Sequence, residues 1–469
     1  MFSRINLPFA FHLGRGYVIA NCHHSVRKEC KVIMRIAVAG TGYVGLVAGV
    51  CFAYMGHDVT CVDIDVKKVE MLRNGIPPIF EADLEEYMKK CSELGRIHYT
   101  TDYRSAYKNA DVIFIGVGTP EMPDGSANLS YVRETARQIA ESVVHDCLVV
   151  VKSTVPVGTN DMVEKFIKEY NKSGAEIEVA SNPEFLSQGS AVHDTLHAPR
   201  IVIGTESEKA ERILRDIYAP FNLPIVSVSR RSAEMIKYAC NDFLALKISY
   251  MNDIANLCEL VGADITDVAK GMSYDKRIGA DYLNAGIGYG GSCFPKDTKA
   301  LRFLAKQHGY TLRTVDSAVG VNTDQKTVLF KKASKRFDSF KGVKTAVLGL
   351  TFKPNTDDLR EAPSLDNISL LLDSGADITA FDPVGTANFK KSIPEGSVSN
   401  GSIRFADSAQ EALDGAQVCF IFTEWKEIRS IEPERFARLM KTPIVYDGRN
   451  IYDIKKMKNA GVEYYSIGR

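Results

Sequence analysis

The sequence lacks the features that mark several large classes of protein. It has no CxxC pair among its 10 Cys, which argues against a zinc site and a disulfide framework. No apolar run approaches the roughly 20 residues that a membrane-spanning helix needs. Basic and acidic residues number 58 each, so no excess charge points to a nucleic acid or an anionic membrane. We therefore expect no metal site, no nucleic-acid partner and no membrane insertion.

What is present is the composition of a globular protein that is too long for a single core. Hydrophobic residues make up 45% and charged residues 25% of the 469 residues. A chain of this length usually divides into two or three domains. The cysteines stand in apolar contexts, as Cys51, Cys61 and Cys147 do, which indicates reduced, buried residues of a cytoplasmic protein. The expected ligand is a small molecule.

Residues 1–33 do not share the pattern of the rest of the chain. The segment has Arg4 and a short apolar patch, but it lacks the long apolar region and the cleavage site of a secretory signal. A complete domain begins at Met34. We expect Met34 to be the natural start and 1–33 to be a non-native extension; a disordered N-terminal arm is the alternative.

A glycine motif opens that domain. Gly40, Gly42 and Gly45 form GxGxxG directly after an apolar strand and before a helix, and Asp63 ends the next strand near the ~20-residue offset of dinucleotide-binding units. The glycines allow a tight turn, close approach of a pyrophosphate and close helix packing, while the helix N-terminus attracts the phosphates. The acid favours NAD over NADP, because it would accept hydrogen bonds from a ribose hydroxyl and repel a 2'-phosphate.

Further apolar runs at 111–120, 147–158, 177–185 and 200–205 alternate with helical stretches. This alternation predicts an α/β fold with a parallel, doubly wound sheet of the Rossmann type over 34–229. Polar residues gather where these strands end, which is the edge at which open α/β sheets bind ligands. They are Thr119, Ser153, Thr154 and Glu184.

From Ser232 the pattern becomes a long helix, which we assign to a central domain over 230–330. Its apolar stripe is typical of a core or of a dimer interface. The stripe consists of Met235, Ala239, Phe243 and Leu246. Lys237 and Asn241 are four residues apart and so share one face of this helix.

Near Lys344 the chain returns to alternating strands and helices, which predicts a second Rossmann-like α/β domain over 331–469. This domain has no GxGxxG motif, so it need not bind a dinucleotide. A substrate held at the boundary between domains is the expected arrangement.

The stretch "GIGYGGSCFPKDT" places Cys293 at the predicted start of a helix, with Ser292 as its cap and Pro295 in its first turn. The positive end of a helix and the nearby Lys296 would favour the thiolate, the form in which cysteine is a nucleophile. The general alternative is an inert, buried cysteine. A nucleophilic thiol beside NAD predicts oxidation of an alcohol to an acid in two hydride transfers, through a thiohemiacetal and a thioester.

From Met34 to Arg469 the chain resembles the UDP-glucose/GDP-mannose dehydrogenase family. The resemblance rests on ordered motifs along the chain, which include "AVAGTGYVGL", "VGTP", "KSTVPVGT", "NPEFLSQGSAVHD", "AEMIKYACNDFLALKISYMNDIA", "DKRIGADYLNAGIGYGGSCFPKD", "GLTFKPNTDDLREAPS" and "DGRN". It implies NAD as cofactor, a homodimer or higher homo-oligomer, and a nucleotide sugar as substrate.

The resemblance also implies roles for individual residues. The catalytic group would be Cys293 as nucleophile, Lys237 and Asn241 as oxyanion stabilisers, Asp297 with an ordered water in proton handling, and Thr154 and Glu184 in proton transfer and water activation. The NAD site would comprise Gly40, Gly42, Tyr43, Val44, Gly45, Asp63, Lys68, Thr119, Thr154, Lys296 and Arg360. The nucleotide-sugar site would comprise Glu184, Phe185, Leu186, Lys237, Asn241, Tyr282, Asn284, Gly288, Gly290, Phe352, Lys353 and Arg449. Arg277 matches an arginine that in the family can reach the substrate of a neighbouring subunit.

Two positions depart from the family pattern. Gln188 stands where many relatives carry Glu, which removes a negative charge near the expected nicotinamide and makes Glu184 the more important carboxylate. Asn128 stands where Asp is common, a loop difference with little consequence for the chemistry.

The lead-in "SYDKRIG" and the loop "GYGGSCFPKD" resemble the members of the family that act on UDP-glucose, so UDP-glucose is the expected substrate. UDP-N-acetylhexosamine, UDP-galactose and GDP-mannose stay open as alternatives. So do two other kinds of protein. An NAD-binding sensor without catalysis would have no need of Cys293, Lys237 and Asp297, and a two-electron dehydrogenase would have no need of Cys293.

Overall fold

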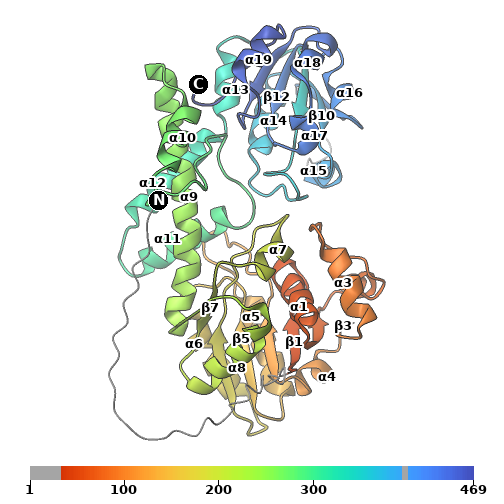
Figure 1. Ribbon diagram of the computed structural model, residues 1–469, viewed down its shortest axis with the longest axis vertical. Helices are drawn as coiled ribbons and strands as arrows, with labels where there is room; N and C mark the ends of the chain where they lie inside the picture. The colour runs from red at the N-terminus through yellow and green to blue at the C-terminus, as the bar shows by residue number, and fades with distance from the viewer. Residues whose placement is uncertain (1–32, 393–399) are drawn as a thin grey trace, which may run out of the picture. The chain divides into compact units, whose positions relative to one another are not determined.

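The computed structural model describes residues 33–392 and 400–469. The prediction of a non-native extension and its alternative, a disordered arm, both concern residues 1–33. Of these residues only Ile33 lies within the described range. The described chain contains an eight-stranded and a six-stranded sheet, with a group of helices between them in the sequence (Figure 1). Within the two described ranges, no helix is long and apolar enough to cross a membrane.

The first sheet follows the expected α/β pattern. Its strands are β1 Arg35–Ala39, β2 Asp58–Val62, β3 Ile97–Thr100, β4 Val112–Ile115, β5 Cys147–Val151, β6 Ile177–Ser181, β7 Ile201–Gly204 and β8 Ile225–Val228. Its helices are α1 Tyr43–Met55, α2 Val66–Arg73, α3 Leu84–Glu93, α4 Tyr103–Lys108, α5 Ser130–Ser142, α6 Thr159–Tyr170, α7 Ala191–Leu196, α8 Glu208–Tyr218 and the short 3-10 helix η1 Ala219–Phe221. The order across the sheet is β3-β2-β1-β4-β5-β6-β7-β8.

One junction of this sheet differs from the parallel arrangement that we predicted. β6 and β7 meet in antiparallel fashion at the single pair Ser181 and Gly204, whereas every other pair of neighbours in the sheet is parallel. The apolar runs on which the prediction rested identify strands but not their direction, because a strand buried on both faces has the same pattern either way. The remainder of the doubly wound prediction is confirmed.

The central helices are α9 Arg230–Val261, α10 Ile265–Ser273, α11 Phe294–Gln307, α12 Arg313–Gln325 and α13 Val328–Ser334. α9 is the long helix expected from Ser232, and it extends over 32 residues (green in Figure 1). The Ser229 side chain accepts a hydrogen bond from the Ser232 N–H at its start, and Gly262, with φ of 75°, ends it. Met235 and Phe243 of the apolar stripe are exposed in the single chain, so the stripe is not part of its core.

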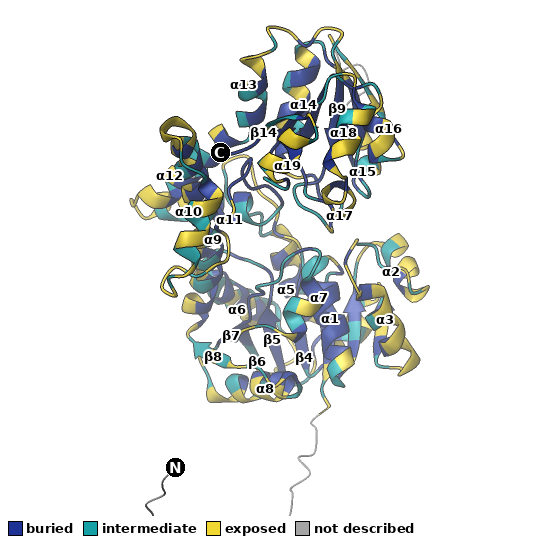
Figure 2. Cartoon of the chain, turned by 45° about the horizontal axis from the view of Figure 1, so that its top comes forward, coloured by how far each residue is buried: buried dark blue, intermediate teal, exposed yellow. Residues whose placement is uncertain are grey.

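The second sheet is parallel throughout. Its strands are β9 Lys344–Leu348, β10 Asp377–Phe381, β11 Ser402–Phe405, β12 Val418–Ile421, β13 Ile444–Asp447 and β14 Glu463–Tyr465, in the order β11-β10-β9-β12-β13-β14. Its helices are α14 Pro363–Asp373, α15 Thr386–Ser392, α16 Ala409–Leu413, α17 Lys426–Arg429, α18 Pro433–Leu439 and α19 Ile454–Asn459. The central strands of both sheets are buried (Figure 2).

Each sheet contains one point where the strand order reverses. In the first sheet it lies between β1 and β4, and in the second between β9 and β12. Connections leave such a point in opposite directions, which opens a crevice at the carboxyl ends of the strands where α/β proteins bind ligands. The fold thus confirms an α/β protein with two Rossmann-like sheets and a long central helix, and it directs attention to these two edges.

Candidate active site

The glycine motif forms the turn that its spacing predicts. Gly40 follows β1 with φ of 93°, a conformation that side chains disfavour. A Cβ on Gly45 would lie 2.0 Å from the main-chain oxygen of Gly40, so no side chain fits where α1 packs against the turn. No atom of the described residues lies within 4 Å of the position of a Cβ on Gly42, which leaves the space above it open. Gly42 is also the N-cap of α1, whose first turn receives no side-chain cap.

Asp63 lies beside this turn and supports it. Its Oδ2 accepts hydrogen bonds from the Thr41 N–H at 2.9 Å and from Thr41 Oγ1 at 2.6 Å, and its Oδ1 accepts the N–H of Asp65 at 3.0 Å. Burial acts to raise the pKa of Asp63, but these hydrogen bonds and the charge of Lys68 outweigh it and lower the pKa. A carboxylate has about four lone-pair sites, so room remains for a ribose hydroxyl.

A cavity of about 760 Å³ opens from the glycine turn. Its wall includes Gly42, Tyr43, Val44, Thr119, Ser153, Thr154, Glu184, Gln188, Cys293, Lys296 and Arg360. The uncapped N-terminus of α1 suits a pyrophosphate, and the buried Gln188 Oε1, which has no partner in the described chain, is a free acceptor in this wall. The residues present therefore fit a dinucleotide.

A second cavity, of about 580 Å³, contains most of the predicted sugar-binding residues. Among its lining residues are Phe185, Leu186, Arg200, Lys237, Cys240, Asn241, Tyr282, Asn284, Gly288, Gly290, Phe352, Lys353 and Arg449. The two cavities share one wall, which consists of Leu186, Gln188, Gly291, Ser292 and Cys293. The thiol of Cys293 thus lies where the expected cofactor and substrate spaces meet.

Cys293 itself is placed differently from the sequence prediction. It, rather than Ser292, occupies the N-cap of α11, and no side chain caps that helix. Lys296 does not act on the thiol, because its Nζ pairs with Asp297 Oδ1 at 2.7 Å. Burial raises the pKa of the Cys293 thiol, the carboxylate of Glu184 adds to this, and Lys237 is the cation that opposes it. These surroundings therefore favour the thiol over the thiolate that we expected.

Two buried pairs lie close to Cys293. Lys237 Nζ is 2.9 Å from Glu184 Oε1, and both side chains are less than 10% exposed. Burial alone would lower the pKa of Lys237, but Glu184 and Asp297 raise it. Burial would likewise raise the pKa of Glu184, but Lys237 and the Leu186 N–H, at 2.8 Å from Oε2, lower it. Each group thus favours the charged form of the other.

The second pair joins α9 to α11. Asn241 Nδ2 donates to Asp297 Oδ2 at 2.6 Å, while the other oxygen of Asp297 accepts from Lys296. Lys237 and Asn241 lie on one face of α9, as their spacing predicts, and both are buried. The helix therefore brings an ammonium and an amide to the same side of the cysteine loop.

The cations from the second sheet are partly occupied by protein groups. Lys353 Nζ donates to Ser187 Oγ at 3.0 Å, and burial lowers its pKa. Arg360 makes a bidentate pair with Asp358, at 2.8 and 2.6 Å. Arg449 donates to the main-chain oxygens of Phe422, Gly288 and Phe352, so it braces the loops of the cavity.

Six of the predicted residues line neither cavity. Gly40, Gly45 and Asp63 form and support the glycine turn, and Asp297, Lys68 and Arg277 lie outside the cavities for different reasons. Asp297 lies behind Asn241, and Lys68 acts through Asp63. Arg277 is exposed and pairs with Asp275 at 2.7 Å, so the single chain does not bring it to the site. Its assignment to a neighbouring subunit stays a prediction.

The residues that hold the site loops were not predicted from the sequence. Asn252, Asn322 and Gln325 bind the main chain of the cysteine loop at Gly286 and Tyr289, at 2.7 to 3.1 Å. Polar residues at helix positions that face a core were the available signal. Glu81 similarly accepts the N–H groups of Gly189 and Ala191, both at 2.8 Å, and so fixes the segment after Gln188.

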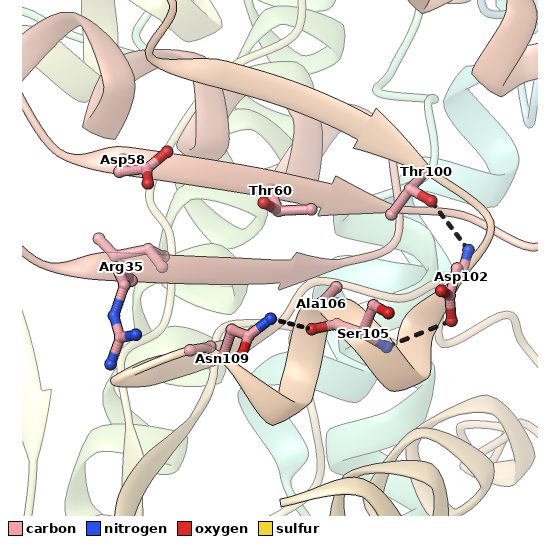
Figure 3. Close-up of a pocket in the computed structure, with 10 residues that line it drawn as sticks. Arg35, Asp58, Thr60, Thr100, Asp102, Ser105, Ala106 and Asn109 are labelled. Atoms are coloured by element: carbon pink, nitrogen blue, oxygen red, sulfur yellow. Dashed lines mark hydrogen bonds between the residues drawn. The ribbon is translucent and has the colours of Figure 1, made fainter.

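A third cavity, of about 320 Å³, lies away from these residues at Arg35, Asp58, Thr60 and α4 (Figure 3). Its polar groups bond with one another: the Asp102 N–H with Thr100 Oγ1 at 3.0 Å, the Ser105 N–H with Asp102 Oδ1 at 3.2 Å, and Asn109 Nδ2 with the Ser105 main-chain oxygen at 3.1 Å. It contains none of the predicted site residues, and its satisfied polar groups indicate a structural surface.

Sequence-family models match three consecutive parts of the chain. The model described as "UDP-glucose/GDP-mannose dehydrogenase family, NAD binding domain" matches residues 34–222, the central domain of the same family matches 231–324, and its UDP binding domain matches 346–454. The first of these covers the glycine turn and Glu184, the second covers Cys293, and the third covers Lys353 and Arg449.

Individual relatives agree with the family models. The UDP-glucose 6-dehydrogenase YwqF of Bacillus subtilis (strain 168) is 48% identical over 436 residues, which cover 93% of this chain and 98% of that protein. The UDP-glucose 6-dehydrogenase of Rhizobium meliloti (strain 1021) is 46% identical and is covered over its full length, with 93% of this chain. A UDP-glucose dehydrogenase structure from Pyrobaculum islandicum has a TM-score of 0.85 at 36% identity and covers 93% of this chain and 98% of its own.

The geometry and the comparisons thus agree on the kind of protein. A dinucleotide turn, a neighbouring cavity and a cysteine between them lie within regions that the family models match. The chain belongs to the UDP-glucose/GDP-mannose dehydrogenase family and is an NAD-dependent oxidoreductase.

Proposed function

We propose that this chain oxidises C6 of UDP-glucose from an alcohol to a carboxylate, giving UDP-glucuronate and two NADH for each sugar. The observation that carries the proposal is the wall shared by the two cavities, in which Cys293 faces both the dinucleotide space and the space lined by Lys353 and Arg449. The relatives from Bacillus subtilis and Rhizobium meliloti are UDP-glucose 6-dehydrogenases, which supports the choice of sugar.

NAD would be held by the glycine turn, Asp63, Thr119, Thr154, Lys296 and Arg360, and when bound it accepts a hydride from C6 in each oxidation. In the first oxidation the C6 hydroxyl would pass its proton to a water molecule beside Thr154 and Glu184, which lie in the wall of the cofactor cavity. The Lys237 ammonium and the Asn241 amide stabilise the oxygen as negative charge develops on it.

Cys293 then adds to the aldehyde. A C–S bond forms as the π bond of the aldehyde opens, and the thiol proton passes to the former aldehyde oxygen. Lys237 opposes the burial that otherwise keeps the thiol protonated. The resulting thiohemiacetal gives up the second hydride and becomes a thioester. Water attacks the thioester carbon, Glu184 accepts the proton of that water, and the C–S bond breaks to release the acid and free Cys293.

Asp297 would hold Asn241 in place and handle protons through an ordered water. Its two oxygens accept from Asn241 and Lys296, so the carboxylate is fixed between α9 and the cofactor cavity. This network supports a role for α9 as the rigid element that carries the oxyanion donors.

We also propose a homodimer that uses α9. Phe243, Tyr250 and Leu257 are spaced by seven residues, and each is more than half exposed in the single chain. A seven-residue apolar repeat is the pattern with which helices pack against a partner. In this assembly Arg277 would approach the substrate of the partner subunit. Light scattering after size exclusion that shows only a monomer would contradict this part of the proposal.

Another nucleotide sugar is the alternative substrate with the same chemistry. The structure of a UDP-D-ManNAc dehydrogenase from Pyrococcus horikoshii has a TM-score of 0.81 at 28% identity, so this fold accommodates other sugars. UDP-N-acetylhexosamine, UDP-galactose and GDP-mannose are therefore included as substrates in the test.

The test measures NADH released per sugar consumed. The wild type should release two NADH per UDP-glucose, and Cys293→Ser should lower turnover by about 10³-fold or more, as removal of a nucleophile does. The matched control is Cys240→Ser, which changes the other cysteine of the same cavity and should keep two NADH per sugar. One NADH per sugar with an active Cys293→Ser variant would contradict the thioester route, and activity with another sugar alone would change the substrate.

A further inference from the structure

Lys152 is a buried cation that the proposed reaction steps do not use. It is the first residue beyond β5, as Asn182 is the first beyond β6, and these parallel strands pair Val151 with Ser181. The Asn182 N–H donates to the Val151 main-chain oxygen at 2.9 Å, which brings the two residues to the same edge of the sheet. Lys152 is 7% exposed and Asn182 1% exposed.

The Lys152 ammonium is held by neutral groups. Its Nζ donates to Asn182 Oδ1 at 2.9 Å and lies 3.4 Å from the Tyr218 hydroxyl. Asn182 is itself fully engaged, because its Oδ1 also accepts from Tyr218 and its Nδ2 donates to the Val202 main-chain oxygen at 2.8 Å. Across residues 33–392 and 400–469, no carboxylate forms an ion pair with Lys152. A buried cation without a carboxylate partner lowers stability, so its presence calls for an explanation.

The charged and titratable groups around Lys152 come from several elements. Glu184 follows β6, Lys237 lies on α9, Cys51 on α1 and Tyr218 on α8. Burial lowers the pKa of Lys152 to about 8, and Glu184 is the group that most opposes this effect. In return, Lys152 adds to Lys237 and the Leu186 N–H in lowering the pKa of Glu184.

We infer that Lys152 is a positioning residue for Glu184, a second buried cation that keeps this carboxylate ionised from the side of the sheet while Lys237 pairs with it from α9. The inference rests on the proposed role of Glu184 in accepting a proton from the attacking water, since only the ionised carboxylate accepts one. Lys237 is also assigned to the reacting oxygen. A second cation therefore keeps Glu184 ionised when the ammonium of Lys237 turns toward the substrate.

A double-mutant cycle in thermal stability tests this coupling without any turnover. It compares the wild type, Lys152→Met, Glu184→Gln and the double variant at pH 7. Lys152→Met should lower Tm more, or raise it less, when Glu184 is present than in the Glu184→Gln background. The control cycle replaces Lys152→Met by Tyr218→Phe, which alters the same cluster without changing charge, and its effects should be additive. An equal change of Tm in both backgrounds for Lys152→Met would overturn the inference.

The second measurement is the pH dependence of kcat. In Lys152→Met the acidic limb should move up by about one pH unit, because Glu184 loses one of the two cations that favour its charged form. Lys152→Arg, which keeps the charge, should retain the wild-type limb, and so should Tyr218→Phe. A Lys152→Met profile that superimposes on the wild type, or an equal shift in Tyr218→Phe, would overturn the inference. If the wild type oxidises none of the sugars, the proposed function fails, and the stability cycle still decides the role of Lys152.

Discussion

The two sheets use the same strand order around their crevices but connect the first strand to its helix differently. After β1, the three residues 40–42 lead directly into α1, whereas residues 349–362 separate β9 from α14. The short turn places the N-terminus of α1 in the wall of the cofactor cavity, where it suits a phosphate. The long loop instead carries Phe352, Lys353 and Arg360 to the two cavities. One fold thus offers main-chain donors at one site and side chains at the other.

Each sheet also has an aspartate directly after the strand that follows its first strand in the sequence. Asp63 follows β2 and binds the turn after β1, and Asp382 follows β10 and binds the loop after β9. The two oxygens of Asp382 accept from Leu350, Thr351, Val384, Gly385 and the Trp425 indole. Asp382 is 4% exposed, whereas Asp63 is half-buried and accepts only from Thr41 and Asp65.

The difference teaches that the position of an acid does not define its role. Asp382 has no free lone pair and no exposed edge, so it organises its loop. Asp63 retains acceptor capacity and is only half-buried, so it is able to meet a ligand as well as support the turn. The number of hydrogen bonds that each carboxylate already accepts distinguishes a structural acid from a binding one.

The largest effect that tests this comparison is expected from Asp382→Ala. The substitution leaves several buried donors without an acceptor, and we expect a loss of about 4 kcal/mol or more in the free energy of unfolding. Asp63→Asn should lower stability much less but weaken NAD binding by about tenfold or more. Urea denaturation and NAD titration measure the two quantities. Equal losses of stability in both variants would break the distinction.

Asp242 on α9 extends the comparison to an acid with no partner. Its two oxygens have no hydrogen-bond partner in the described chain, and it is 5% exposed. Burial, followed by the charge of Asp297, raises its pKa to about 8. Its folded-state pKa lies above the unfolded value of 3.8, so the stability of the wild type should decline as the pH rises from about 4 to 8.

Asp242→Asn removes this titration and should be more stable than the wild type by about 2–3 kcal/mol at pH 8, with no advantage near pH 4. The measurement is the difference in Tm between the two proteins across this range. A difference that does not change with pH would show that Asp242 is ionised or solvated in the native protein.

Smaller effects are expected from the glycines of the first turn. Gly45→Ala places a Cβ 2.0 Å from the Gly40 oxygen and should lower stability by about 1–3 kcal/mol through displacement of α1. Gly42→Ala, where nothing lies within 4 Å, should leave the Tm of the NAD-free protein unchanged and weaken NAD binding. Differential scanning fluorimetry with and without NAD separates the two. A matching loss of Tm in both variants would contradict the assigned spaces.

The smallest effect concerns the third cavity. Arg35 pairs with Asp111 at 2.6 Å, but the arginine side chain is 55% exposed. Solvent screens such a pair, so Arg35→Ala should change stability by less than about 1 kcal/mol. The KM for NAD and the rate of sugar oxidation should stay unaltered. A change in the KM for NAD would show that this cavity belongs to the functional surface, contrary to what its self-bonded polar groups indicate.

Much of the fold and of the candidate site was predictable because it depends on local patterns. The GxGxxG spacing predicted the turn that Gly40 and Gly45 form, and the four-residue spacing predicted the common face of Lys237 and Asn241. The antiparallel contact of β6 and β7 was not predictable, because the apolar pattern of a buried strand is the same whichever way the strand runs. The cap of α11 was assigned one residue too early, because serine is a common N-cap residue whereas the structure places Cys293 at this position.

The sequence by itself determined the α/β class, the position of the dinucleotide turn, and which residue types could perform the chemistry, because helix and strand periodicity and turn geometry act over a few neighbouring residues. Only the tertiary structure decided which charges act on Cys293. Lys296 lies three residues away in the chain but pairs with Asp297, whereas Lys237 comes from a distant helix. Burial and ion pairing depend on atoms brought together from separate elements, and that is why the protonation of the thiol is set by the fold and not by its neighbours in the sequence.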